Sequence, residues 1–380
     1  MNNTDKSGAR GIEAIRSRLS RRGFLMGTAG LAAASTLSAC SSPFAQDGGS
    51  NGGGGKKLSI TMFVFLGGDL AKMPKEFAKE YMESNPNVSI EFYEQSNSVG
   101  YGKMLAQRKA DPEKPLVNMG FFNTNTSIQG IGDDMWESLD YSSMKNAADV
   151  LPIFQRDDHK GIGIGSDQYG LLLNPDALGS KPTSWSALWD RKYKGTLSLF
   201  NFPWYAVYAA ALANGGSLDD MEPGWKIWEE RADQIKLIVE SNPQYLNVLS
   251  DGTAPLTTYF AGTGQQWINE GAPLEYVVPD EGAMPLPVFL QSVAGQGDDE
   301  TEVCQDIINE MLSPKWVSRW AETSIEIPAT QSAEIPDSLA DLPAFQQSTI
   351  DGLLEIDYDI VGEKQAEWTE RWNNNVVPKI

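Results

Sequence analysis

Residues 168–204 read QYGLLLNPDALGSKPTSWSALWDRKYKGTLSLFNFPW. The apolar run over 169–173 predicts a buried strand, and the Asn-Pro pair that follows ends it in a turn. Ser184 is placed to cap a short helix whose tryptophans and leucine share one face. The chain then alternates between apolar and polar residues over 196–200, which predicts a second strand. Strand, short helix and strand in this order indicate an α/β fold.

This succession contains the segments NPDAL, PTSWxxLW and YKG. It resembles the passage from the first to the second lobe in the extracellular solute-binding proteins of ABC importers. Residues 271–282, GAPLEYVVPDEG, resemble a second segment of that family, G-x-P-[hydrophobic]-x-[aromatic]-x-x-P-x-E-G. Each motif alone is weak, but their order and spacing are specific. The resemblance covers about residues 58–345 and is greatest to the spermidine/putrescine-binding and ferric-iron-binding branches.

The resemblance implies a two-lobed periplasmic-binding-protein fold of type II. In that fold each lobe is a mixed, mostly parallel sheet flanked by helices, and crossover strands form a hinge. We expect lobe 1 to comprise residues 57–173 and 280–380, and lobe 2 to comprise 174–279. The strand over 274–278 is expected to cross back to lobe 1. A C-terminal helix over 365–373 is expected to dock on lobe 1.

The N-terminus carries export signals. SRRGFL matches the twin-arginine export pattern through Arg21 and Arg22, and a short run of small and apolar residues follows. LSAC then matches a bacterial lipobox, in which Cys40 becomes the lipidated, palmitate-bearing residue. We therefore expect residues 1–39 to be a signal peptide and 40–56 to be a flexible Gly/Ser-rich tether. The implied protein is anchored by lipid on the periplasmic or extracytoplasmic side of a membrane.

Composition limits the partners. The 380 residues have a net charge of −21 and a mean hydropathy of −0.34. Residues 1–39 carry six basic and two acidic side chains, so the remainder has a net charge of −25. Such a surface disfavours nucleic acid, because binding it requires clustered Lys and Arg. The charge could attract a cationic ligand over long range, or it could serve solubility alone.

The first lobe supplies candidate ligand contacts. Residues 57–66, 88–94 and 116–122 are predicted strands, with helices between them, which indicates a parallel sheet. The ligand crevice of an open α/β sheet lies beyond the carboxyl ends of its strands. The candidates beyond the first and third strands are Phe65, Gly67, Asp69, Phe122 and Asn123.

The second lobe supplies the remaining candidates. Asn201 and Trp204 lie at the start of a predicted helix, where free backbone N–H groups would face the cleft. The resemblance implies that Tyr259 matches an aromatic residue that contacts ligand, and Glu281 lies in the E-G segment. Aromatic faces with carboxylates suit an ammonium group, so the expected ligand is a cationic amine such as putrescine or spermidine.

The expected site departs from that of polyamine-binding relatives in its acidic residues. Polyamine-binding relatives carry an acidic pair where this chain has residues 201–204, NFPW. Asp69, Asp251, Asp280 and Glu281 are replacements that the sequence offers. An anionic solute, a phosphonate or a carboxylate, remains an alternative through the helix N-terminus at Trp204. Ferric iron is a further alternative, although the adjacent tyrosines of its binders are missing.

Catalysis finds no support in the sequence. There is no G-x-S-x-G elbow, and the single histidine, His159, lies in a charged loop without a zinc-binding partner. Cys304 reads as a buried structural thiol in a helix. We therefore expect no enzyme, no catalytic residue, no metal and no cofactor. The expected partners of this monomer are a small solute, an ABC permease and its ATPase. A membrane-anchored enzyme and a ligand-free adaptor lipoprotein are the alternatives of another class.

Overall fold

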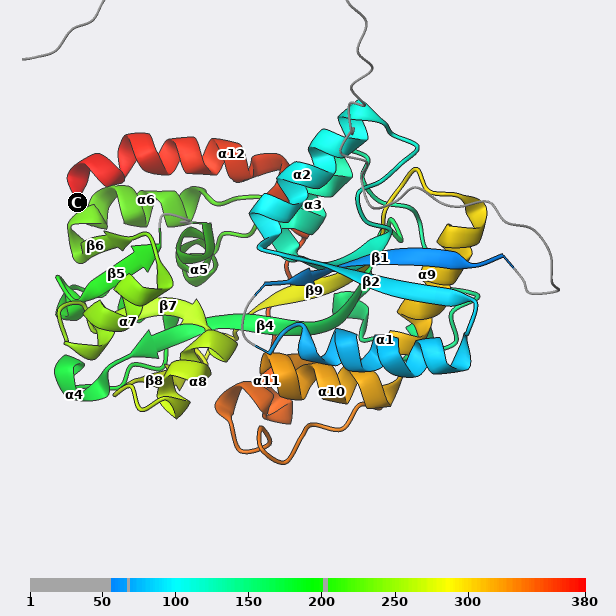
Figure 1. The fold of residues 1–380 in the computed structure, drawn as a ribbon. Coiled ribbons are helices and arrows are strands. Elements are labelled where there is room, and N and C mark those ends of the chain that lie inside the picture. The colour runs from blue at the N-terminus through cyan, green and yellow to red at the C-terminus, as the bar shows by residue number, and fades with distance from the viewer. Residues whose placement is uncertain (1–55, 67–68, 201–203) are drawn as a thin grey trace, which may run out of the picture. The chain divides into compact units, whose positions relative to one another are not determined.

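A computed structural model describes residues 56–66, 69–200 and 204–380 (Figure 1). The strands of this part form one sheet in the order β2-β1-β3-β9-β4-β7-β5-β6, with β8 and β10 paired to β4. The strands are β1 Leu58–Phe65, β2 Val88–Gln95, β3 Met119–Asn123, β4 Ile162–Leu173, β5 Leu197–Phe200, β6 Ile235–Val239, β7 Leu256–Phe260, β8 Glu275–Val277, β9 Met284–Ser292 and β10 Ile327–Pro328.

Helices flank this sheet on both sides. They are α1 Lys72–Ser84, α2 Asn97–Ala110, α3 Thr124–Gly132, α4 Pro175–Leu178, α5 Trp204–Ala213, α6 Glu222–Arg231, α7 Asn242–Ser250, α8 Ala261–Asn269, α9 Asp298–Met311, α10 Pro314–Ser324, α11 Gln347–Asp351 and α12 Tyr358–Asn375. The predicted short helix after Ser184 is a 3-10 turn, Trp185–Leu188, and the Ser184 side chain accepts a hydrogen bond from Ser186 N as expected of a cap. The mixed α/β architecture predicted from the sequence is confirmed.

β4 joins the two groups of strands. It pairs with β9 along residues 162–169 and with β7 along residues 169–173. β1, β2 and β3 therefore lie beyond its first half, and β5, β6 and β7 lie beyond its second half. Since β4 leaves one group and enters the other without a break, it is a crossover strand.

The returning crossover differs from the prediction. The strand predicted over 274–278 is the short β8, which pairs only with β4 at residues 171–173. β9 makes the return instead. β9 was not predicted as a strand, because Pro285 and Pro287 lack the N–H that a residue of a central strand donates. The structure accommodates both prolines where β9 has β4 as its only strand neighbour, and side-chain hydroxyls from Tyr358 and Thr124 donate to their carbonyl oxygens.

The C-terminal helix also differs from the prediction. α12 begins against the first lobe, where Arg156 Nη2 lies 2.8 Å from Asp359 Oδ1. Its later turns pack on α5 and α6 of the second lobe rather than on lobe 1 alone. Arg371 pairs with Glu222 at 2.7 Å and with Glu229 at 2.9 Å on α6. The sequence predicted this helix, but its place depends on distant partners, which include α3 as well as α5 and α6.

The N-terminal predictions lie outside the described residues. They are the signal peptide 1–39 with Arg21 and Arg22, the lipidated Cys40 and the tether up to residue 55. Within the described ranges, no helix has the length and apolar character needed to cross a membrane. Cys304 is a buried thiol of α9, as predicted.

Candidate functional site

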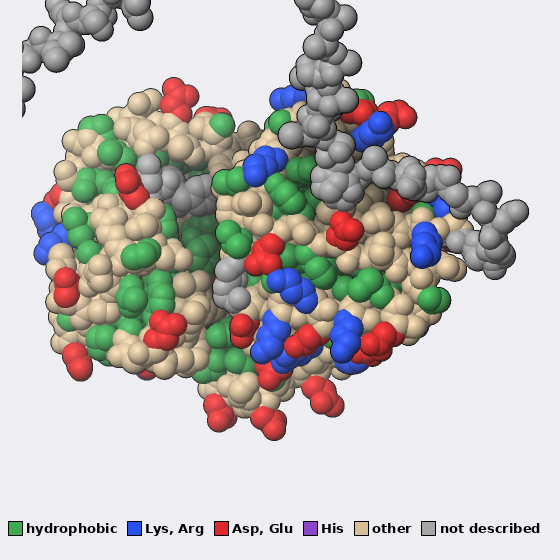
Figure 2. Space-filling model, in the orientation of Figure 1, with side chains coloured by type: hydrophobic (Ala, Val, Ile, Leu, Met, Phe, Trp, Pro, Cys, Tyr) green, Lys and Arg blue, Asp and Glu red, His purple; other side chains and the backbone are tan. Residues whose placement is uncertain are grey.

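The carboxyl ends of the parallel strands in the two lobes face each other. β1 and β3 run in the same direction as β4, toward the second lobe, because β9 is antiparallel to both β3 and β4. β7 is antiparallel to β4, and β5 is parallel to β7, so both run toward the first lobe. Figure 2 shows a hollow in the surface between the two groups of strands, with hydrophobic side chains along it. This is where open α/β sheets bind ligands.

The first-lobe wall is formed by the residues that end β1 and β3. Phe65 ends β1 and is 8% exposed. Asp69 follows, and its side chain is 70% exposed, with Lys72 Nζ at 3.9 Å. Asn123 ends β3, and its Oδ1 accepts a hydrogen bond of 3.0 Å from Thr126 N, which caps α3. Phe65, Asp69 and Asn123 are therefore placed at the strand ends as the sequence predicted, with Asp69 the most accessible.

Three of the predicted aromatic contacts are buried. Phe122 is fully buried, with its ring stacked on Phe63 at 5.1 Å. Tyr259 is fully buried, and its hydroxyl donates to Asn242 Oδ1 at 2.5 Å. Trp204 is 1% exposed. These three rings belong to the hydrophobic cores, and their direct contact with a ligand stays a prediction. The other two candidates, Gly67 and Asn201, lie outside the described residues.

Glu281 and its neighbour are engaged in local structure. Glu281 accepts hydrogen bonds from Ser184 Oγ at 2.5 Å and from Trp185 N at 3.2 Å. Asp280 accepts one from Thr183 Oγ1 at 2.7 Å. Both carboxylates are exposed, and they anchor the 3-10 turn that the GAPLEYVVPDEG segment meets. A ligand contact by Glu281 stays a prediction.

Two aromatic residues of the second-lobe wall were missed. Phe200 ends β5 and Phe260 ends β7, and both are half-buried. The ring of Phe260 lies 4.5 Å from that of Tyr169, which in turn stacks on Tyr205 at 4.1 Å. The signal was present in the sequence, since each of the two is the last residue of a strand whose carboxyl end faces the cleft. Tyr259 points to the opposite face of β7 and is buried, so its neighbour Phe260 is better placed to contact a ligand.

Two carboxylates near the middle of β4 were also missed. Asp167 accepts backbone hydrogen bonds from Gly262 N at 3.0 Å and from Gln168 N at 2.8 Å. Burial nevertheless raises the pKa of Asp167 to about 6. Glu326 is 8% exposed, and burial together with the nearby charge of Asp167 raises its pKa well above the usual value. A sequence presents such residues as ordinary solvated charges, because nothing local marks Glu326 as buried or Asp167 as half-buried.

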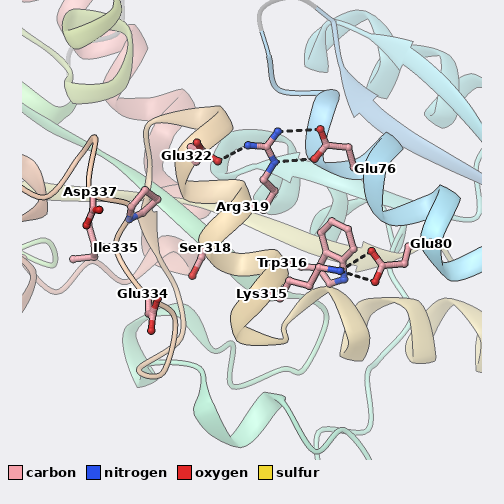
Figure 3. A pocket seen from close by; sticks show the side chains of 11 residues that line it. Glu76, Glu80, Lys315, Trp316, Ser318, Arg319, Glu322, Glu334, Ile335 and Asp337 are labelled. Atoms are coloured by element: carbon pink, nitrogen blue, oxygen red, sulfur yellow. Dashed lines mark hydrogen bonds and ion pairs between the residues drawn. The ribbon is translucent and has the colours of Figure 1, made fainter.

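A separate cleft of about 610 Å³ lies between α1, α10 and residues 334–337 (Figure 3). Arg319 holds Glu76 through two hydrogen bonds of 2.7 and 2.9 Å and also pairs with Glu322. Lys315 holds Glu80 at 2.5 Å. The basic side chains of this cleft thus form ion pairs with carboxylates of the same cleft. Its place on the first lobe separates it from the facing strand ends.

Arg319→Gln is expected to lower the free energy of unfolding by less than about 1 kcal/mol. Glu76 and Glu322 are both more than 40% exposed, so water replaces the lost partner. Urea unfolding of the variant and of the unmodified chain measures the difference. A loss several times larger would show that this cleft is a structural centre rather than a solvated surface.

A family model described as bacterial extracellular solute-binding protein matches residues 76–347 of this chain. That range runs from within α1 to the first residue of α11, and so includes both crossover strands, the second-lobe wall and the part of the first-lobe wall at the end of β3. A search of curated protein sequences returns no match.

Solved structures share the fold. An ABC transporter protein from Clostridium perfringens is 17% identical with a TM-score of 0.71, over 83% of this chain and 99% of that one. The spermidine/putrescine transporter substrate-binding protein PotD from Streptococcus pneumoniae, in complex with calcium and HEPES, is 18% identical with a TM-score of 0.66, over 84% and 99%. The binding protein MotA from A. tumefaciens, in complex with glucopine, is 18% identical with a TM-score of 0.64, over 84% and 100%.

Proposed function

This chain belongs to the bacterial extracellular solute-binding proteins, the substrate-binding components of ABC transporters, and we propose that its solute is a cationic amine such as putrescine or spermidine. The observation that carries the proposal is the pair of facing walls. Phe200 and Phe260 are half-buried rings at the strand ends of the second lobe, and Phe65, 8% exposed, ends β1 on the facing side. Ring faces attract an ammonium group through their quadrupoles.

One carboxylate and the net charge support the same ligand class. The exposed side chain of Asp69 lies just beyond the carboxyl end of β1. A carboxylate at such a place forms a charge-assisted hydrogen bond with an ammonium group. The net charge of −21 adds a long-range attraction for cations.

The structural relatives leave the ligand open, because the same fold occurs in a spermidine/putrescine transporter protein and in a protein complexed with glucopine. The choice therefore rests on the side chains of the cleft. An anionic solute would instead use backbone N–H groups at the start of α5, beside Trp204. Ferric iron would require several oxygen ligands that converge on one point.

Transport would follow from closure of the lobes. A solute that contacts both walls binds the closed arrangement more tightly than the open one, and this difference in affinity shifts the equilibrium toward closure. The closed form would be recognised by an ABC permease and its ATPase. Residues 1–39 would direct export through Arg21 and Arg22, and lipid on Cys40 would hold the monomer at the membrane by a slack tether.

A diamine or polyamine at a hundred times its dissociation constant is expected to raise the free energy of unfolding by about 2.7 kcal/mol. Thermal unfolding of the full chain against amines, phosphonates, carboxylates and ferric ion measures this effect. Asp69→Asn and Phe260→Leu are each expected to weaken amine binding about tenfold, because one removes a charge and the other a ring face.

Asp176→Asn is the matched control. Asp176 is an exposed carboxylate of α4, beyond the far end of β4, so its loss should leave amine binding unchanged. Stabilisation by anions alone would reject the amine and favour the start of α5. Stabilisation by ferric ion alone would favour the iron-binding branch, and silence across the panel would favour a ligand-free adaptor.

A further inference from the structure

Asp167 and Glu326 lie side by side where the two lobes meet. β10 pairs with β4 in the register Ile327 with Ser166 and Pro328 with Gly165. One step further along the same register, Glu326 comes opposite Asp167. Opposing residues of neighbouring strands have their Cβ atoms about 5 Å apart. The two carboxylates are therefore close neighbours within the crossover region.

Each carboxylate is bound to a different lobe. Asp167 accepts a hydrogen bond of 3.0 Å from Gly262 N in the first turn of α8, which follows β7 in the second lobe. Glu326 Oε2 accepts one of 2.8 Å from Trp320 Nε1 on α10, whose ring stacks on Phe121 of β3 at 4.9 Å. Figure 1 shows α8 and α10 next to the middle of β4. The carboxylate pair thus connects a helix of one lobe with a helix of the other.

No cation compensates this pair among the described residues. Neither carboxylate takes part in an ion pair there, and the groups that surround Asp167 electrostatically are the hydroxyls of Tyr169, Tyr259 and Tyr276 from β4, β7 and β8. Glu326 faces Asp167 and the indole of Trp320. Two like charges held together in a poorly solvated place cannot both ionise readily, so one proton stays with the pair.

The backbone around the pair is tight. A Cβ at Gly262 would lie 3.0 Å from Ile325 O and 3.2 Å from Asp167 Oδ2, so α8 approaches the end of α10 as closely as a glycine allows. Ile325 has a φ of 58°, in the left-handed region that a β-branched residue rarely adopts. Such strain persists only where the surroundings enforce it, and it is frequent in switch regions. A small local shift of the backbone therefore cannot relieve a repulsion between the two carboxylates.

We propose that Asp167 and Glu326 hold a single proton near neutral pH, and that loss of this proton pushes α8 away from α10, so that the arrangement of the two lobes depends on pH. The proposal rests on the proposed function only in taking the lobes as moving parts. Burial and the nearby charge of Asp167 both raise the pKa of Glu326, so the loss of the second proton of the pair is the step expected to move the lobes. The device would tie capture of a solute to the acidity outside the cell.

The first test follows the indole of Trp320. In ¹⁵N-labelled full chain, the Trp320 Nε1–H resonance, assigned by its loss in Trp320→Phe, is titrated from pH 5 to pH 10. We expect a shift with a midpoint above that of an ordinary carboxyl group. Glu326→Gln should abolish the titration. Asp167→Asn should lower the midpoint by on the order of one pH unit, because the repelling neighbour is gone.

The second test measures the distance between the lobes without any solute. Spin labels are placed at Asn269→Cys on α8 and Lys79→Cys on α1, both exposed positions. We expect the distance distribution to change across the same pH interval and to stay constant in the Asp167→Asn, Glu326→Gln double variant. Glu322→Gln, an exposed carboxylate of α10, is the control that should keep the response.

Folding stability gives an independent check. Because the pKa values of both carboxyls are higher in the folded chain than their usual values, the folded state binds more protons than the unfolded state above about pH 4. The free energy of unfolding should therefore fall as pH rises through 6, and less so in the double variant.

The outcomes separate this proposal from the transport function. A Trp320 resonance that does not titrate, or a pH-independent distance distribution in the unmodified chain, would overturn the proton device and leave solute binding untouched. If no solute stabilised the chain in thermal unfolding while the Trp320 resonance titrated as expected, the proposed solute would be rejected and the proton device would stand.

Discussion

Replacing Trp372 by alanine is expected to lower the free energy of unfolding by about 3–5 kcal/mol. Trp372 lies on α12 with no exposed surface, and its ring packs edge-on against Trp228 of α6 at 5.8 Å. Truncation leaves a cavity between α12 and the second lobe that neither helix can close by itself, because Arg371 fixes α12 to α6 through Glu222 and Glu229. Urea unfolding followed by circular dichroism measures the loss.

A double-mutant cycle gives this prediction its specificity. Trp372→Ala and Trp228→Ala should be non-additive by at least about 0.5 kcal/mol, since the two rings share one contact. Glu370→Gln is an exposed change on the same helix and should alter stability by less than about 0.5 kcal/mol. A Trp372→Ala variant with nearly unchanged stability would contradict the docking of α12 on the second lobe.

Gly170→Ala is expected to destabilise the chain by about 3 kcal/mol, at the upper end of overpacking effects. Gly170 lies on the second half of β4, and an added Cβ would come within 2.5 Å of Tyr276 Oη and 2.8 Å of Val277 O. The carbonyl belongs to the backbone of β8, so relief of the clash requires β8 to move away from the crossover strand. Equilibrium unfolding and hydrogen exchange of the β8 amides report on this movement.

Gly102→Ala is the matched control for that substitution. Gly102 lies exposed on α2, and nothing stands within 4 Å of the position its Cβ would take. Alanine in a helix has less unfolded-state entropy to lose than glycine, so this variant should gain up to about 1 kcal/mol. Equal effects of the two substitutions would mean that β8 is not packed against β4 in solution.

The sequence predicted the elements whose pattern is complete within a short window. β1 and β2 are examples, because the dense apolar run of β1, the apolar alternation of β2 and the helix between them require no knowledge of distant residues. β9 shows the limit of this reasoning. Pro285 and Pro287 argue against a central strand, and only the one-sided pairing of its first half, visible in three dimensions, makes them acceptable.

The candidate site was predictable at the level of strand ends and not at the level of side-chain direction. Tyr259 and Phe260 are adjacent and both aromatic, yet a strand points them to opposite faces, and one becomes buried while the other lines the cleft. Glu326 was out of reach for a different reason. The role proposed for Glu326 depends on Asp167, which lies more than 150 residues earlier in the chain. The two come close together only through the register of β10 on β4.

The crossover strands also determine the order in which the chain must fold. Ile162 of β4 pairs with Leu290 of β9, so the central ladder closes a loop that contains the entire second lobe. During synthesis β4 leaves the ribosome well before β9, so the edge of β4 that pairs with β9 stays unpaired in the meantime. Contacts of such long range slow folding, and a waiting strand edge can pair with another chain. Refolding from denaturant should therefore be slow and should lose yield as the protein concentration rises.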